Sequence, residues 1–125
     1  MAAMDQLGLP AKTCRVELQI GVARRELRFS TPVITVGRSA PGQTTPPDID
    51  LEHDDSVSRQ HAEMRWTGGR LSLVDQSSTN GTWLNGEKLA PGQPHWLKDG
   101  DRIAVGRLSV LTVHLAGGQD AGSSS

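Results

Sequence analysis

The sequence predicts an all-β fold, an antiparallel β-sandwich or barrel, on three observations. Apolar and polar residues alternate with a period of two in several short segments, and no segment sustains the period of a helix. Turn-forming sequences separate these segments at close intervals. Short strands with close turns are typical of antiparallel sandwiches and barrels.

The first two predicted strands form a hairpin. Apolar residues alternate with polar ones from Val16 to Val22, which places one apolar face on a half-buried strand. The polar run at 23–26 is then expected to turn the chain into a returning strand at 27–29.

The remaining predicted strands follow at short intervals. They are expected at 33–36, 62–66, 71–74, 82–84, 88–89, 95–97, 103–105 and 108–115. Turn sequences separate several of them, namely T-G-G-R at 67–70, N-G at 85–86, K-D-G-D at 98–101 and G-R at 106–107.

The length of 125 residues suits one domain. We expect a flexible N-terminal segment at 1–13, one folded domain at 14–115 and a flexible Gly/Ser-rich tail at 116–125. The single cysteine, Cys14, permits no internal disulfide and is interpreted as a small apolar residue that opens a strand.

Composition excludes several classes of function. A net charge of -1 argues against general binding of nucleic acid or acidic membranes, and 3 % aromatic residues argue against a surface that stacks bases. The sequence has no apolar run of about 20 residues, so we expect no membrane span and a cytoplasmic protein. Any anion site must therefore be local.

Two loops and four short motifs stand out. The segment 39–57 has few strand signals and is rich first in proline and then in acidic residues, and the second loop is 75–81. The motifs occur at strand ends and turns and are Gly37-Arg38, Ser58-Arg59-Gln60-His61, Thr79-Asn80-Gly81 and Asn85-Gly86. Each motif alone has an ordinary structural explanation, such as a type I′ turn for Asn-Gly.

Together the motifs supply what a phosphorylated side chain requires. An arginine fork meets two oxygens of a phosphate dianion, and hydroxyl groups with nearby backbone N–H groups bind the others. An asparagine amide can donate to and accept from a peptide main chain at once. These residue types predict a site for one phosphate on a peptide.

The sequence resembles a forkhead-associated (FHA) domain from about Val33 to Leu115. The resemblance rests on the ordered motifs V-I-T-V-G-R, D-I-D-L, S-V-S-R-Q-H-A, D-Q-S-S-T-N-G-T-W-L-N-G and L-K-D-G-D-R-I-A-V-G. It implies a β-sandwich of about eleven strands with recognition loops at one end. It also implies a monomeric adaptor without cofactor or catalysis that binds phosphothreonine in a protein or peptide, such as a Ser/Thr kinase or its substrate.

The resemblance also assigns roles to individual residues. Those that would contact the phosphopeptide are Arg38, Ser58, Arg59, Thr79 and Asn80. Those that would support the site by shaping loops or turns are Gly37, His61, Gly81, Asn85 and Gly86. The sequence departs from the common pattern in one place, because the long Pro-rich segment after Arg38 is expected to reshape one wall of the cleft. An acidic run follows this segment.

The acidic run at 48–55 has two interpretations, a solvated loop or a surface that repels acidic residues in the bound peptide. A further hypothesis is that Thr44 or Thr45, once phosphorylated, occupies the cleft of another copy.

Other functions remain as alternatives. A phosphate-independent scaffold of the same fold is the main one. A hydrolase built from Ser58, His61 and Asp75 lacks a nucleophile elbow. The four histidines lack the spacing of a metal site, so we expect no metal.

Overall fold

The computed structural model describes residues 13–115, and all regular elements of this part are strands. Their bounds are β1 Cys14–Ile20, β2 Ala23–Phe29, β3 Val33–Gly37, β4 Ile49–Asp50, β5 Ala62–Thr67, β6 Arg70–Asp75, β7 Thr82–Leu84, β8 Glu87–Lys88, β9 His95–Trp96, β10 Arg102–Val105 and β11 Ser109–Leu115. The rest of the predicted N-terminal segment (1–12) and the predicted tail (116–125) lie outside the described residues.

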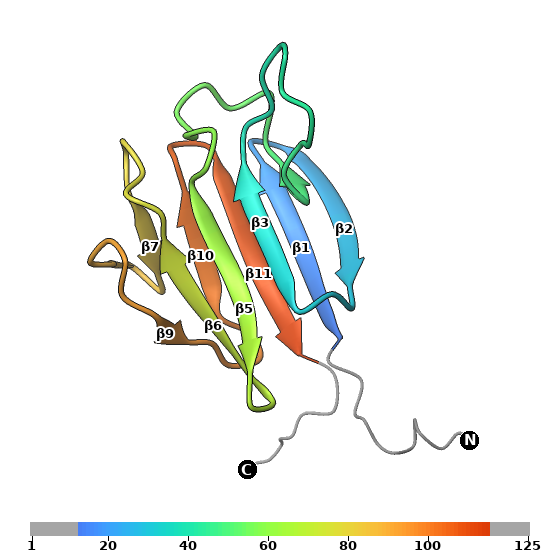
Figure 1. The fold of residues 1–125 in the computed structure, drawn as a ribbon, viewed down its shortest axis with the longest axis vertical. Coiled ribbons are helices and arrows are strands. Elements are labelled where there is room, and N and C mark those ends of the chain that lie inside the picture. Colours follow the sequence, from blue (N-terminus) through green and yellow to red (C-terminus); the bar gives the residue numbers. More distant parts are fainter. Residues whose placement is uncertain (1–12, 116–125) are drawn as a thin grey trace.

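The strands form two sheets that lie one over the other (Figure 1). One sheet has the order β2-β1-β11-β10-β7-β8, and the other has the order β4-β3-β5-β6-β9. All pairings are antiparallel except β3 with β4, which pair in parallel between Val36 and Ile49. The predicted antiparallel sandwich is confirmed. The sequence did not predict β4, because two residues are too few to show periodicity.

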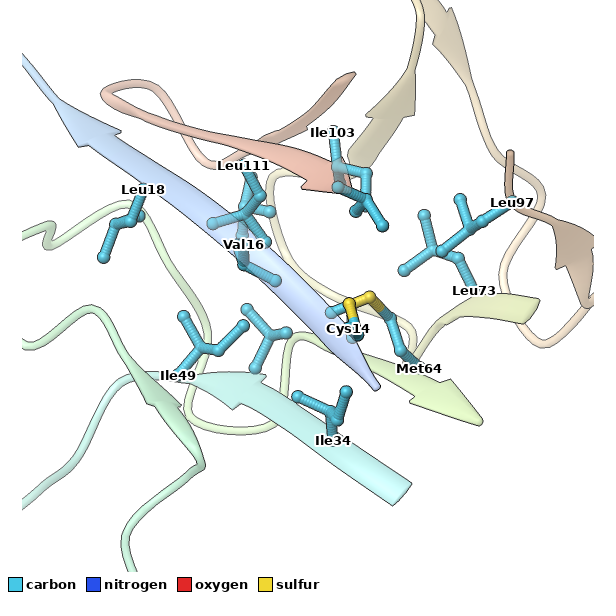
Figure 2. Close-up of a cluster of buried hydrophobic side chains, with 14 of the residues drawn as sticks. Cys14, Val16, Leu18, Ile34, Ile49, Met64, Leu73, Leu97, Ile103 and Leu111 are labelled. Atoms are coloured by element: carbon cyan, nitrogen blue, oxygen red, sulfur yellow. The ribbon is translucent and has the colours of Figure 1, made fainter. Parts of the chain in front are cut away.

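The core lies between the sheets, where alternate residues of each strand meet. Val16 and Leu111 of the six-stranded sheet face Ile34, Met64 and Leu73 of the other, and none of these five is exposed (Figure 2). The core is aliphatic, as the low aromatic content predicts. Period-two alternation produces this arrangement because successive strand residues point to opposite faces.

Cys14 opens β1 and is fully buried in this core (Figure 2). Burial raises the pKa of its thiol to about 12, because an apolar environment disfavours the thiolate. The thiol is therefore protonated at neutral pH and behaves as a small apolar side chain.

The first hairpin turns earlier than predicted. Ile20 pairs with Ala23, so the turn is Gly21-Val22 and the predicted turn at 23–26 is wrong. Gly21 has a φ of 59°, which glycine adopts readily in a two-residue hairpin loop. Val22, predicted on the apolar face, is 99 % exposed at the tip of the turn. The polar run belongs instead to β2, an edge strand, where charged side chains are common.

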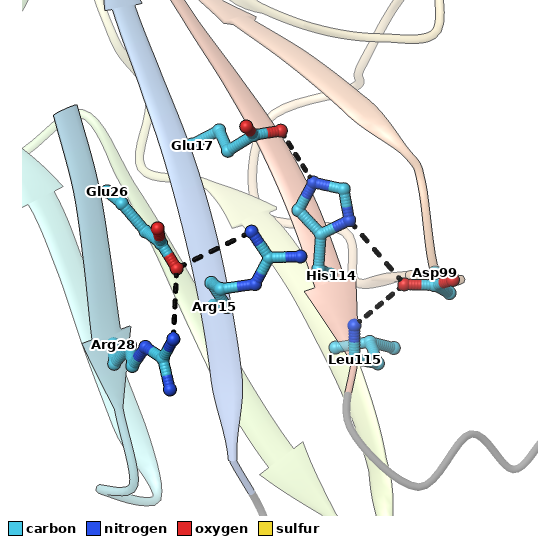
Figure 3. A network of polar contacts seen from close by, with 7 residues as sticks. All are labelled: Arg15, Glu17, Glu26, Arg28, Asp99, His114 and Leu115. Atoms are coloured by element: carbon cyan, nitrogen blue, oxygen red, sulfur yellow. Dashed lines mark hydrogen bonds and ion pairs between the residues drawn. The ribbon is translucent and has the colours of Figure 1, made fainter. Parts of the chain in front are cut away.

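The outer face of the six-stranded sheet carries exposed ion pairs (Figure 3). Glu26 of β2 lies 3.5 Å from Arg15 of β1 and 3.3 Å from Arg28. His114 Nε2 of β11 donates to Glu17 at 2.7 Å. Within residues 13–115 no helix is long and apolar enough to cross a lipid bilayer.

Candidate functional site

The loops that carry the predicted site residues meet at one end of the sandwich, opposite the end where β1 begins and β11 ends (Figure 1). The first contact is between the end of β3 and the segment 58–59. A Cβ on Gly37 would lie 2.0 Å from the backbone oxygen of Arg59, so only glycine fits there. The backbone N–H of Arg38 donates to the carbonyl of Ser58 at 3.1 Å.

The side chain of Arg38 is half-buried and makes one hydrogen bond within the protein. Its Nε–H donates to the carbonyl of Val57 at 2.8 Å, which fixes the plane of the guanidinium. No acceptor for its terminal nitrogen atoms lies among the described residues. Arg38 therefore presents an oriented cation with uncommitted donors next to Ser58.

His61 joins the two main loops and is fully buried. Its Nδ1 accepts from the backbone N–H of Ser58 at 2.9 Å, and its Nε2 lies 2.8 Å from the carbonyl of Gly81. These partners require a neutral ring with the proton on Nε2, because one nitrogen accepts and the other must donate. His61 thus supports the loops, and both of its ring nitrogens are occupied.

Two further hydrogen bonds join the loops above His61. The backbone N–H of Thr79 donates to Ser58 Oγ at 2.9 Å. The side-chain amide of Asn80 donates to the carbonyl of Ser56 at 2.7 Å. Because Ser58 Oγ already accepts, its own proton is free to be donated elsewhere. The structure thus brings Arg38, Ser58, Thr79 and Asn80 together, with the exposed Arg59 beside Ser58.

Asp75 shapes the second loop from inside. It is 1 % exposed, and its carboxylate accepts from Ser78 Oγ at 2.5 Å, from Thr82 Oγ1 at 2.7 Å and from the Ser78 backbone at 3.2 Å. The sequence indicates a role for Asp75 only as part of a possible hydrolase. An aspartate at the start of a polar loop commonly accepts hydrogen bonds from nearby backbone N–H groups, and this signal would have indicated its role.

The side chains of the possible hydrolase are not arranged as a triad. Ser58 contacts His61 through its backbone N–H, not through its hydroxyl. Asp75 binds Ser78 and Thr82, and the far nitrogen of His61 binds Gly81. A triad requires the hydroxyl, the imidazole and the carboxylate in one line of hydrogen bonds.

Asp54 is a second buried carboxylate, and no sequence motif indicates its role. It is 1 % exposed and accepts from Ser56, from the Leu108 backbone at 3.1 Å and from Ser109 Oγ at 2.8 Å. Burial by itself raises the pKa of this carboxyl, but these hydrogen bonds outweigh burial and hold the pKa below its usual value. Asp54 therefore ties the first loop to the β10–β11 turn.

Comparison with known proteins agrees with this geometry. A family model for the FHA domain matches residues 34–106. This chain belongs to the FHA-domain family. FraH of a Nostoc species is 35 % identical over 82 % of this chain, and the match spans 39 % of FraH. The glycogen accumulation regulator GarA of Mycolicibacterium smegmatis is 32 % identical over 94 % of this chain and 70 % of GarA.

A solved structure extends the comparison to three dimensions. The N-terminal FHA domain of Rad53p from S. cerevisiae, in complex with a phosphothreonine peptide, has a TM-score of 0.66 and 30 % identity to this FHA domain. The match covers 82 % of this chain and 93 % of that one. The family resemblance and the FHA-type sandwich predicted from the motifs are confirmed.

The Asn85-Gly86 turn of this FHA domain lies away from the loop cluster. It joins β7 to β8, and both residues have positive φ, 50° and 91°, as a type I′ turn requires. Asn85 bonds to Asp101 at 3.0 Å and to the Arg102 backbone at 2.9 Å. These contacts are at the opposite end of β7 from Thr82. Gly81, by contrast, lies in the cluster through its bond to His61.

Two clefts flank Arg59 on the side of the Pro-rich loop. One has a volume of about 450 Å³ and is lined by Ala40, Pro41, Gly42, Gln43, Arg59 and Gln60. The second, of about 270 Å³, includes Thr45, Pro46, Pro47 and Glu63. The Pro-rich loop forms a wall of both clefts. The phosphorylation of Thr44 or Thr45 stays a prediction.

Most carboxylates of the acidic run accept hydrogen bonds within the protein that hold this loop in place. Asp48 accepts from the backbone N–H of Thr35 at 2.9 Å, and Asp50 accepts from that of Ser39 at 3.0 Å. Together with the buried Asp54, they stabilise the loop through hydrogen bonds. Among the described residues, no group of three or more His, Cys, Asp or Glu side chains is arranged to hold a metal ion.

Proposed function

We propose that this FHA domain binds phosphothreonine on partner proteins and acts as an adaptor in Ser/Thr kinase signalling. The observation that carries the proposal is that Arg38 and Ser58 lie next to each other. The two residues are joined by a backbone hydrogen bond, yet the terminal guanidinium nitrogens and the hydroxyl proton remain uncommitted. Adjacent cationic and hydroxyl donors suit a phosphate dianion.

The other residues would complete the contact with the peptide. Arg59 and Thr79 are exposed on either side of Ser58 and would donate to the remaining phosphate oxygens. Asn80 uses only one amide proton internally, so its other proton and its oxygen can bind a peptide main chain. The clefts beside Arg59 provide room for neighbouring peptide side chains.

The comparisons support this proposal. The Rad53p domain was solved with a phosphothreonine peptide, and GarA is a regulator of glycogen accumulation. We further propose that the protein is a cytoplasmic monomer with no catalytic activity. His61 and Asp75 bond to Gly81, Ser78 and Thr82 rather than to each other, which supports the absence of catalytic activity.

The test is a titration of matched peptides carrying Thr or phosphothreonine, measured by fluorescence anisotropy. Arg38→Ala should weaken the phosphothreonine complex at least about a hundredfold, because it removes two charge-assisted hydrogen bonds worth roughly 1.5–3 kcal/mol each. Arg102→Ala is the matched control, since this exposed arginine lies at the far end of β10. It should leave the affinity unchanged.

The alternative is a phosphate-independent scaffold of the same fold. It predicts equal affinity for plain and phosphorylated peptides and no effect of Arg38→Ala. That result, with folding verified by circular dichroism, would refute the proposed function.

A further inference from the structure

We propose that Trp96 and Arg70 form a second docking surface, which binds an acidic segment of a partner protein independently of phosphothreonine. The inference goes beyond the proposed function, because an adaptor that joins two proteins needs a contact besides its phosphopeptide site. Trp96 lies in β9, an edge strand of the five-stranded sheet, and Arg70 begins β6.

This surface lies away from the loop cluster. β5 begins at Ala62, directly after His61, and ends at Thr67, which pairs with Arg70 across the β5–β6 turn. A strand rises about 3.4 Å per residue, so this turn lies roughly 17 Å from the loop end of β5. Figure 1 shows the turn and β9 in the half of the sandwich away from the loops. The cleft and this surface can therefore be occupied at the same time.

Trp96 is the most exposed tryptophan of the protein. It is 46 % exposed, whereas Trp66 and Trp83 are half-buried. Val22 and Leu108, the other large apolar residues exposed within 13–115, lie in turns at the loop end. Tryptophan and arginine are the residues that most often carry the binding energy of an interface. An exposed tryptophan beside an arginine is therefore suited to anchor a partner.

Arg70 holds the indole of Trp96 in place. Its guanidinium carbon lies 4.1 Å from the centroid of the Trp96 ring. Stacking of this kind uses the flat face of the guanidinium and leaves the N–H groups at its edge free to bind a carboxylate. Because the two side chains are ordered against each other in advance, association loses less conformational entropy.

A second arginine extends the surface. Trp96 pairs with Ser72 of β6, and Ser72 pairs with Arg65 of β5, so these three side chains share one face of the sheet. It is the outer face, because Leu73, next to Ser72, is buried in the core. Ser72 itself is only 5 % exposed, which fits cover by the large side chains on either side. Arg65, Arg70 and Trp96 therefore form one continuous surface.

The charge of this surface is mainly positive. Among the described residues no carboxylate forms an ion pair with Arg70, or with the exposed Lys98 two positions after the indole. Arg65 pairs with Glu63. On the outer face of the six-stranded sheet, by contrast, several cations pair with carboxylates (Figure 3). An acidic segment would supply the missing anions, and the net charge of -1 means that overall attraction does not explain such a preference.

The experiment selects binders to the unaltered full chain from a displayed library of random, non-phosphorylated peptides. Peptides that also bind Trp96→Ala are removed. We expect the retained peptides to carry two or more Asp or Glu residues around an aliphatic residue, which would pack on the indole. Retained peptides without enrichment of acidic residues, or a failure to retain any, would overturn the inference.

Fluorescence anisotropy then compares the affinity of a retained peptide for two charge variants. Arg70→Gln should weaken binding about three- to tenfold, because it removes a charge-assisted contact at an exposed site. Lys88→Gln is the matched control, since Lys88 lies 5.7 Å from the ring centroid of Trp83 on the other sheet and its loss changes the charge equally. It should leave the affinity unchanged. Equal losses would indicate general charge attraction and overturn the inference.

Two further measurements separate this surface from the cleft and from a general anion site. Neither Arg38→Ala nor a saturating phosphothreonine peptide should change the affinity of the retained peptide, and a loss with either would place that peptide in the cleft and overturn the inference. A thymidine oligonucleotide of the same length should not displace the peptide, and displacement at a similar concentration would also overturn it. If phosphothreonine peptides do not bind at all, the proposed function fails while this inference stands.

Discussion

Two polar networks of this protein differ in burial. At the loop end, Asp54, His61 and Asp75 are at most 1 % exposed. Asp54 and His61 join segments that are separate in the chain, and Asp75 holds its own loop together. On the outer face of the six-stranded sheet, the side chains of Arg15 and Glu26 are 38 % and 45 % exposed and pair across neighbouring strands (Figure 3).

The comparison shows that burial decides how much a polar contact contributes to the free energy of unfolding. Water replaces a lost partner on the sheet face, so exposed ion pairs add little stability. At the loop end the carboxylates are almost fully buried, so a lost partner leaves a buried donor unsatisfied. The loop network therefore holds the proposed binding site, whereas the sheet network is expected to add little to the free energy of unfolding.

The strongest test of the loop end is Gly37→Ala. The added methyl group would lie 2.0 Å from the Arg59 backbone oxygen, and backbone cannot yield as a flexible side chain does. We expect a loss of more than about 3 kcal/mol in the free energy of unfolding, measured in urea, because overpacking of this severity exceeds the usual range.

Gly21→Ala is the control for Gly37→Ala. Gly21 has a φ of 59° but nothing within 4 Å of a Cβ, so only backbone strain of about 1 kcal/mol is expected. Equal losses in the free energy of unfolding for the two variants would show that close packing at Gly37 is not the cause of the destabilisation.

A smaller effect is expected for Asp54→Ala. Removing the carboxylate leaves the donors of Ser56, Leu108 and Ser109 without an acceptor, which should cost about 2–3 kcal/mol. The neighbouring exposed acid provides the control, because Asp55→Ala changes the charge equally. Thermal unfolding of both variants measures the difference, and a similar Tm for the two would refute the distinction between buried and exposed acids.

The smallest effect is expected on the sheet face, for Glu17→Gln. The hydrogen bond from His114 and the charges of Arg15 and Arg24 hold the pKa of Glu17 below its usual value. Its contribution to stability is therefore present above about pH 4.3, the ordinary pKa of glutamate, and is lost as the pH falls through the lowered pKa.

Thermal melts of the unaltered protein and Glu17→Gln should differ slightly at neutral pH and coincide in acid. The difference should also shrink in about 1 M salt, where screening acts over about 3 Å. A loss as large as that of Asp54→Ala would contradict the contrast between the two networks.

The sequence predicted most strands within one or two residues, because period-two alternation reflects the burial of one strand face. It misplaced the first turn, since the polar residues Arg24 and Arg25 look like a turn but occupy an edge strand. From local motifs it identified residues that meet at the loop end, but it also assigned Asn85-Gly86 to the site, and this turn lies elsewhere. It missed the role of Asp54, because Leu108 and Ser109, which bond to this carboxylate, lie 54 and 55 residues further along the chain.

The sequence by itself therefore determined the fold class, the family and the residue types available for a phosphate. Only the tertiary structure decided which polar groups form hydrogen bonds within the protein and which remain available to a ligand. Ser58 meets Thr79 across 21 residues, and Asp54 meets Ser109 across 55. Such contacts arise from how the two sheets pack, and packing brings together residues whose positions in the chain carry no signal of each other.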